Sequence, residues 1–66
     1  MLPDDLGKII GILERNDGRM TQLELRRELH YSEAKVSLML ADLENQGVIR
    51  KFKRGRGNVI ILVKPD

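Results

Sequence analysis

The sequence predicts an α+β domain in which three helices are followed by a two-stranded β-hairpin. Three observations lead to this prediction. Residues 1–47 repeat apolar side chains at helical spacing, the pattern changes after Gly47 to one typical of strands, and the whole chain has 66 residues. A chain this short can bury one hydrophobic core, so we expect residues 1–66 to form a single domain.

The first helix is predicted over residues 4–16. An apolar stripe begins at Leu6, ends at Leu13 and follows the spacing i, i+3, i+4, i+7, which places its members on one helical face. The turn signal Asn16-Asp17-Gly18 ends the helix. Residues 19–20 are then expected to form a short extended link to the next helix.

Two further helices are predicted over residues 22–29 and 33–46. Thr21 opens a capping-box pattern, because a Glu follows it three residues later. Ser32 stands where the third helix needs an N-cap, and Gly47 follows its last turn. The short turn between these helices predicts a helix-turn-helix pair.

The hairpin is predicted over residues 48–63. Its second strand is the β-branched run at residues 59–63, and a basic, Gly-rich turn at residues 54–58 precedes it. An isolated hairpin is unstable, so it must pack against the helices. A helix-turn-helix of three helices followed by such a hairpin is the winged-helix arrangement, in which the hairpin is called the wing.

Composition excludes several functions. The chain has no cysteine, which rules out a disulfide framework, a Cys-based zinc site and thiol catalysis. It has one His and no Trp, and no nucleophile–base pair or metal-ligand set can be assembled, so we expect no enzyme, cofactor, metal or small-molecule substrate. No apolar run approaches the roughly 18–20 residues of a membrane span. We expect a cytoplasmic protein, although its parent protein could be membrane-anchored.

The net charge of +2 conceals an asymmetry. Residues 48–66 contain six bases and one acid, whereas residues 1–47 contain six bases and nine acids. A basic pole indicates either contact with a phosphate backbone or a simply solvated hairpin. Side chains alternate between the two faces of a strand, so the bases cannot all face one duplex. One side of the strand would carry Arg50, Phe52 and Arg54, and the other Lys51 and Lys53.

Four motifs in register resemble winged-helix regulators of the MarR-like group, especially archaeal versions at the end of longer, sometimes membrane-anchored, predicted regulators. The motifs are M-T-Q-x-E-L at Met20–Leu25, S-x-A-K-V-S at Ser32–Ser37, L-E-x-x-G-V-I at Leu43–Ile49 and G-R-x-N-x-I-x-L at Gly55–Leu62. The resemblance implies a DNA-binding module of a transcriptional regulator. Its third helix would enter the major groove of double-stranded DNA, and its wing would lie on the phosphate backbone.

The resemblance also implies which residues contact DNA. With the neighbouring Lys53 included, they are Ser32, Lys35, Ser37, Leu38, Lys53, Arg54, Arg56 and Asn58. Residues near the start of a recognition helix reach base edges, and Arg suits phosphates and narrow grooves. Glu33, at another family contact position, is expected mainly to stabilise the first helical turn.

The third helix departs from the family pattern. Leu38 stands where relatives typically carry Arg, and the helix has one base, Lys35, against Glu33, Asp42 and Glu44. The alternative function is therefore a winged-helix protein-interaction module that uses this acidic helix and Leu38. Recognition of left-handed or double-stranded RNA helices has less support.

A lone module of this size does not reach tight specific binding of DNA, so we expect a homodimer or a larger parent chain. Candidate dimer contacts are Leu2, Ile9 and Ile12. Ile12 is included because it lies off the apolar stripe of the first helix.

Overall fold

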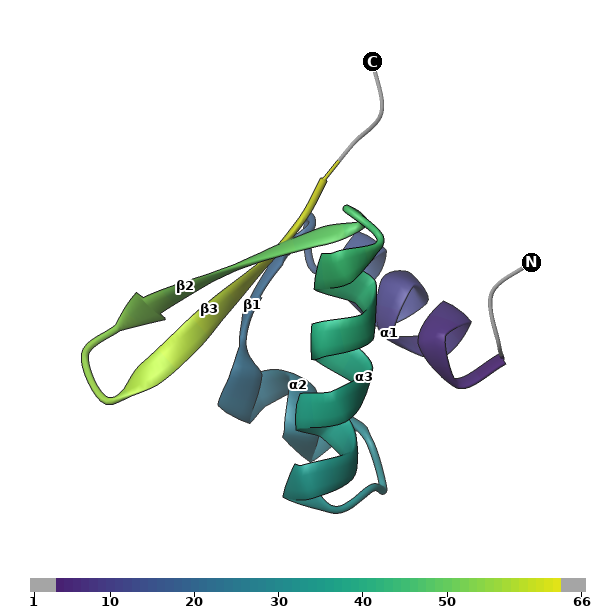
Figure 1. Cartoon of the computed structure of the whole chain (residues 1–66), viewed down its shortest axis with the longest axis horizontal. Helices are drawn as coiled ribbons and strands as arrows, with labels where there is room; N and C mark the ends of the chain where they lie inside the picture. Colours follow the sequence, from purple (N-terminus) through teal and green to yellow (C-terminus); the bar gives the residue numbers. More distant parts are fainter. Residues whose placement is uncertain (1–3, 64–66) are drawn as a thin grey trace.

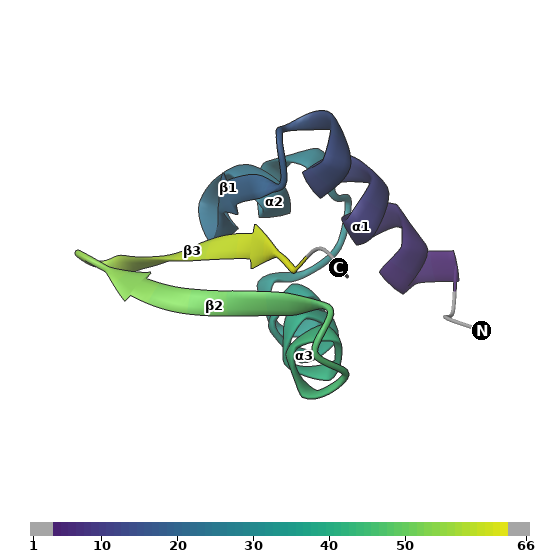
Figure 2. The ribbon, with the colours of Figure 1, turned by 90° about the horizontal axis from the view of Figure 1, so that it is seen from above.

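Residues 4–63, which the computed structural model describes, form three helices and a three-stranded antiparallel sheet. In chain order the elements are α1 (Asp4–Arg15), β1 (Arg19–Thr21), α2 (Gln22–Glu28), α3 (Glu33–Asn45), β2 (Ile49–Arg54) and β3 (Gly57–Leu62). The hairpin of β2 and β3 extends away from the helices, as Figures 1 and 2 show. The α+β class and the three helices are thus confirmed.

Local capping explains where the helices begin and end. Thr21 and Glu24 form the predicted capping box: the backbone N–H of Glu24 donates to Thr21 Oγ1 over 3.0 Å, and the backbone N–H of Thr21 donates to Glu24 Oε1 over 2.9 Å. Ser32 Oγ accepts the backbone N–H of Lys35 at 3.1 Å and caps α3. Gly47 follows α3 with a φ of 75°, which favours glycine. Each helix ends one residue earlier than predicted.

The sheet has a third strand beside the β2–β3 hairpin, so the prediction that it has two strands is wrong. The strand order is β1-β3-β2, and β1 is the segment expected to be a simple link. Met20 of β1 pairs with Ile60 of β3, and both side chains are buried. Pairing with β1 satisfies backbone groups of β3 that a two-stranded hairpin would leave open.

The hairpin turn is shorter than predicted. Arg54 pairs with Gly57, so two residues, Gly55 and Arg56, make the turn, and Gly57 belongs to β3. Gly55 has a φ of 59° and Arg56 does not share this positive φ. This is the pattern of a type II′ turn, whose first central position requires glycine.

The core lies between the helices and one face of the sheet, and α1 contributes more to it than its predicted stripe. Ile9 and Ile12 are 0% and 7% exposed, and both belong to the core. They are therefore unavailable as dimer contacts, which corrects that prediction. The reason is that α1 packs against α2, α3 and the sheet together, so more than one face of it is covered. Leu2, the third predicted contact, lies outside the described residues.

Candidate nucleic-acid interface

The third helix presents an apolar ridge to solvent. Its buried side carries Val36, Met39, Leu40 and Leu43, which pack into the core. On the opposite side, Ala34, Leu38 and Ala41 share one face at helical spacing, and all three are exposed. Leu38 is 73% exposed, which makes its side chain the most prominent apolar group on this surface.

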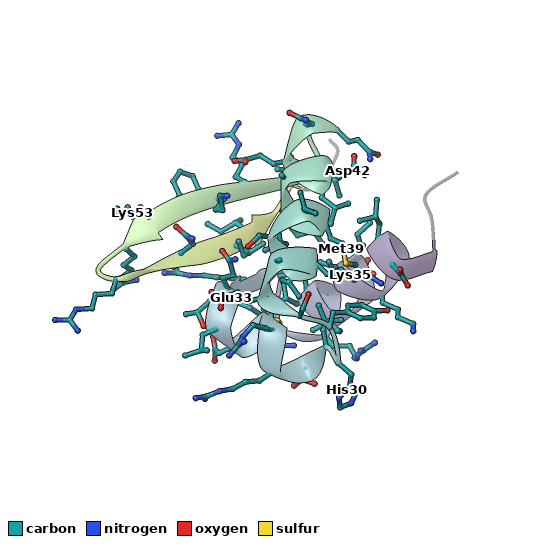
Figure 3. All side chains as sticks on the ribbon, turned by 60° about the horizontal axis from the view of Figure 1, so that its bottom comes forward. His30, Glu33, Lys35, Met39, Asp42 and Lys53 are labelled. Atoms are coloured by element: carbon teal, nitrogen blue, oxygen red, sulfur yellow. The ribbon has the colours of Figure 1, made fainter. Side chains whose placement is uncertain are left out.

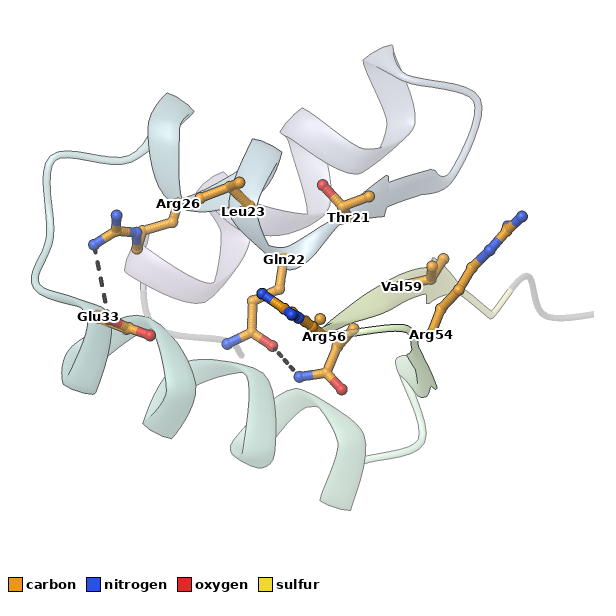
Figure 4. A pocket seen from close by; sticks show the side chains of 10 residues that line it. Thr21, Gln22, Leu23, Arg26, Glu33, Arg54, Arg56 and Val59 are labelled. Carbon is orange, nitrogen blue, oxygen red and sulfur yellow. Dashed lines mark hydrogen bonds and ion pairs between the residues drawn. The ribbon is translucent and has the colours of Figure 1, made fainter.

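One flank of this ridge is joined to the hairpin by a chain of side-chain hydrogen bonds. Asn58 Nδ2 of β3 donates to Gln22 Oε1 at 2.9 Å. Gln22 Nε2, at the start of α2, donates in turn to Ser37 Oγ of α3 at 3.3 Å. Figure 4 shows the bond between Gln22 and Asn58. Asn58 lies one residue from the last pair before the turn, so this relay ties the hairpin near its turn to α2 and α3. It also unites two of the predicted contacts, Ser37 and Asn58.

The register of the hairpin sorts its bases onto two faces. Lys53 pairs with Asn58, and Lys51 pairs with the fully buried Ile60. Side chains of directly opposed residues lie on the same face of a sheet. Lys51 and Lys53 therefore lie on the face that carries Asn58 and looks toward the helices. Arg54 lies on the other face, in agreement with the predicted alternation.

Arg56 lies in the turn and lines a cavity of about 530 Å³ between the hairpin and α2. Gln22, Asn58 and Arg54 line the same cavity, and Figure 4 shows Arg56 next to Gln22. Arg26 stands at the far end of this cavity and forms an ion pair with Glu33 at 3.9 Å. The tip of the hairpin therefore adds a positive charge close to the relay.

Lys35 lies on the opposite flank of α3. Figure 3 shows Lys35 near α1 and Lys53 on the hairpin, with α3 between them. Lys35 Nζ forms an ion pair with Asp5 Oδ2 at 3.3 Å and lies 4.2 Å from the centre of the Tyr31 ring. The Tyr31 hydroxyl donates to Asp5 Oδ1 at 2.9 Å. The predicted contact Lys35 is thus turned toward α1 rather than toward the hairpin.

This cluster lowers the pKa of Asp5. The hydrogen bond from Tyr31 is the main cause, and the interactions with Lys35 add to it. The carboxylate of Asp5 stays ionised and holds Lys35 in place. The predicted contact Ser32 also has a partner within the protein, because its Oγ accepts the backbone N–H of Lys35 and caps α3.

Five of the predicted contacts thus share one surface, which we call the relay face: Ser37, Leu38, Lys53, Arg56 and Asn58. Lys35 and Ser32 lie outside the relay face, and Arg54 borders it at the shared cavity although its strand position is on the other face of the sheet. The binding of all eight residues to DNA stays a prediction. Gln22 was missed by sequence reasoning. Its position as the first residue of α2 carries no signal of a contact with residues 15 and 36 positions away.

Among the residues that the structure describes, no ion pair involves a base of the hairpin. Within residues 4–63 the ion pairs are Arg26–Glu33 and Lys35–Asp5, and neither includes a base of the hairpin. Arg50, Lys51, Lys53, Arg54 and Arg56 are all exposed. Their charges are therefore available to an anionic partner.

Comparisons with known proteins give the family but no function. Within residues 4–63, no helix combines the length and apolar composition that crossing a membrane requires. No curated protein and no solved structure matches the chain. A family model described as "Domain of unknown function (DUF7343)" matches residues 2–63. Because this match covers nearly the whole chain, the protein belongs to the DUF7343 family.

Proposed function

We propose that this chain is a winged-helix, MarR-like DNA-binding module of a transcriptional regulator, with α3 as the recognition helix and the β2–β3 hairpin as the wing. One observation carries the proposal: a hairpin with five unpaired bases is held by the Ser37–Gln22–Asn58 relay beside the exposed side of α3. Duplex DNA offers a major groove wide enough for a helix and phosphates beside it for the wing.

The α3 residues and the hairpin residues of the relay face would contact different parts of the DNA. Ser37 and Leu38 lie near the N-terminal half of α3, where side chains reach base edges, and Leu38 suits the methyl group of thymine. Lys53 and Arg56 would bind phosphates, together with Lys51 on the same face of β2. The acids on α3 oppose phosphate, so most of the affinity would come from the wing, and it would depend strongly on salt.

The test is a fluorescence anisotropy titration of the domain with a labelled mixed-sequence duplex from about 20 to about 200 mM salt. Neutralising about four phosphates gives a slope of log K against log salt near −3.6. The hairpin offers a matched pair of variants on one strand. Lys51→Ala with Lys53→Ala removes two charges from the side toward the helices, and Arg50→Ala with Arg54→Ala removes two from the other side.

We expect the double lysine variant to flatten the slope by about 1.8, because each lost phosphate contact removes about 0.9. The double arginine variant should change the slope much less. A folded domain that does not bind the duplex at low salt refutes the proposal. Equal effects of the two double variants would show that DNA does not dock from the side of α3.

A second function, a winged-helix module that binds another protein, is favoured by the apolar ridge of α3. Leu38 is 73% exposed between two exposed alanines, and Glu33, Asp42 and Glu44 surround the ridge with negative charge. An apolar ridge with acidic flanks is more typical of a protein contact than of a DNA contact. This protein partner would bind the exposed face of α3 and would not contact the hairpin.

Leu38→Lys separates the two functions because they predict opposite signs. If the ridge faces DNA, the added positive charge should strengthen duplex binding and steepen its salt dependence. If the ridge binds a protein through apolar contact, the same substitution should abolish that binding and leave the hairpin's weak affinity for DNA unchanged. Circular dichroism would confirm that the variant is folded, since position 38 lies on the surface.

A further inference from the structure

The sheet has a second exposed surface, on the side away from the helices, which we call the outer sheet face. Its residues follow from the strand register. Arg50 and Arg19 pair with Ile61 from either side, and Phe52 and Thr21 pair with Val59 in the next row. Arg54 lies one row further toward the tip. The members of the outer sheet face are Arg19, Thr21, Arg50, Phe52, Arg54, Val59 and Ile61.

The helices leave this face largely open and border it at the cavity that Thr21, Arg54 and Val59 help to line. They cover the other face of the sheet, where Met20, Ile49 and Ile60 are buried in the core. On the outer sheet face the three arginines and Thr21 are exposed, Ile61 is half-buried, and Val59, beside Phe52, is buried. Phe52 is 49% exposed, although a ring of this size normally finds cover in a folded domain.

The arrangement around Phe52 is specific. Arg50 and Arg54 are two residues before and after it on the same strand and face, and they span about 13 Å at the rise of a β-strand. Arg19 lies two strands away in the row of Arg50. The face has no acidic member, and neither of the ion pairs within residues 4–63 involves its arginines. An exposed aromatic ring thus lies among three guanidinium groups that have no ion-pair partner in the described part of the chain.

This chemistry matches single-stranded nucleic acid better than other anionic partners. A base stacks on an exposed aromatic ring, and arginines beside it bind the phosphates before and after that base. In a duplex the bases are paired and stacked on one another, so none is available to stack on the Phe52 ring. A membrane surface would require several apolar side chains to insert, and this face has a single exposed one, Phe52. An acidic peptide would form ion pairs with the arginines, but its carboxylates would not stack on the Phe52 ring.

We propose that the outer sheet face binds single-stranded nucleic acid, with one base stacked on Phe52 and the backbone held by Arg19, Arg50 and Arg54. This site lies on the opposite face of the sheet from Lys53 and Asn58, and it meets the relay face at the cavity that Arg54 and Arg56 both line. It does not depend on the proposed binding of duplex DNA, and the two can fail separately.

The experiment measures the affinity of the domain for a labelled dT12 oligonucleotide at about 20 mM salt. Phe52→Leu keeps an apolar side chain and removes the ring, so it should weaken binding about 5- to 150-fold, the loss of one base stack. Arg50→Ala with Arg54→Ala should also weaken it. Lys51→Ala with Lys53→Ala is the matched control on the other face, and it should have much less effect.

Two further measurements separate stacking from charge. An abasic oligomer of the same length keeps the phosphates and lacks bases, so Phe52→Leu should leave its weaker binding unchanged. Phe52→Trp introduces the only tryptophan of the chain. Its fluorescence should be quenched by dT12 and unaffected by polyglutamate.

The inference is overturned if dT12 does not bind, or if Phe52→Leu binds dT12 as well as the original chain does. It is also overturned if polyglutamate binds with equal affinity and the same dependence on Arg50 and Arg54, which would indicate an acidic protein partner. Loss of dT12 binding in the double lysine variant would instead place single strands on the relay face.

Discussion

Replacing Gly55 by alanine should destabilise the domain, and the cause is the backbone alone. Gly55 has a φ of 59° in the two-residue turn, and a Cβ built there meets no atom within 4 Å. The cost is therefore the positive φ of an L-residue, about 1–2 kcal/mol. For a domain of this size the melting temperature falls by about 4–8 °C for each kcal/mol. Thermal unfolding followed by circular dichroism measures the change.

Gly57→Ala is the matched control, since a Cβ at Gly57 also meets no atom within 4 Å and Gly57 lacks a positive φ. This variant should be neutral or gain about 0.4–1 kcal/mol, because alanine restricts the unfolded chain. D-alanine at position 55, introduced by chemical synthesis, prefers the positive φ and should stabilise the turn. If Gly55→Ala melts at the original temperature, or if both L-alanine variants shift the melting temperature equally, the positive φ of Gly55 is not the cause of the cost.

Three further outcomes are expected. Met20→Ala should cost about 2–5 kcal/mol in denaturant unfolding, because Met20 is 6% exposed in the core; a surface-like effect below about 0.5 kcal/mol would contradict its place in β1. The pKa of Asp5 is lowered from its usual 3.8, so its stabilisation is present above that pH and lost as pH falls through the lowered value. Asp5→Asn should therefore lower the melting temperature at pH 7, and the difference should vanish toward pH 2; a difference that does not depend on pH would contradict this. Gln22→Ala breaks the relay, so hydrogen exchange of the hairpin amides should accelerate while that of the α1 amides stays unchanged. Equal hairpin exchange rates in the variant and the original protein would show that the relay does not hold the wing.

The elements that sequence reasoning placed correctly are those decided by neighbours along the chain. The capping box at Thr21, the cap at Ser32 and the glycine after α3 act within one helical turn. The alternation of bases along β2 follows from the pleat of a single strand. Such features need no knowledge of the rest of the fold.

The missed features have no local signal. A three-residue strand such as β1 is too short to show alternation, and its pairing with β3 joins residues about 40 positions apart, such as Met20 and Ile60. Ile12 lies off the predicted stripe and is buried, because α1 is covered by several elements at once. The type II′ turn was read as a longer loop, since the register that shortens it is set by strand pairing.

The three helices with their caps, the basic hairpin and the separation of its charges onto two faces can all be predicted from the sequence. The place of β1 in the sheet, the turn of Lys35 toward Asp5 and the link from Ser37 through Gln22 to Asn58 appear only in the folded chain. The difference lies in how far apart along the chain the interacting residues are. Caps, turns and periodicity are interactions over a few residues, whereas the contacts that orient the relay face and open the outer sheet face form only when distant segments pack together.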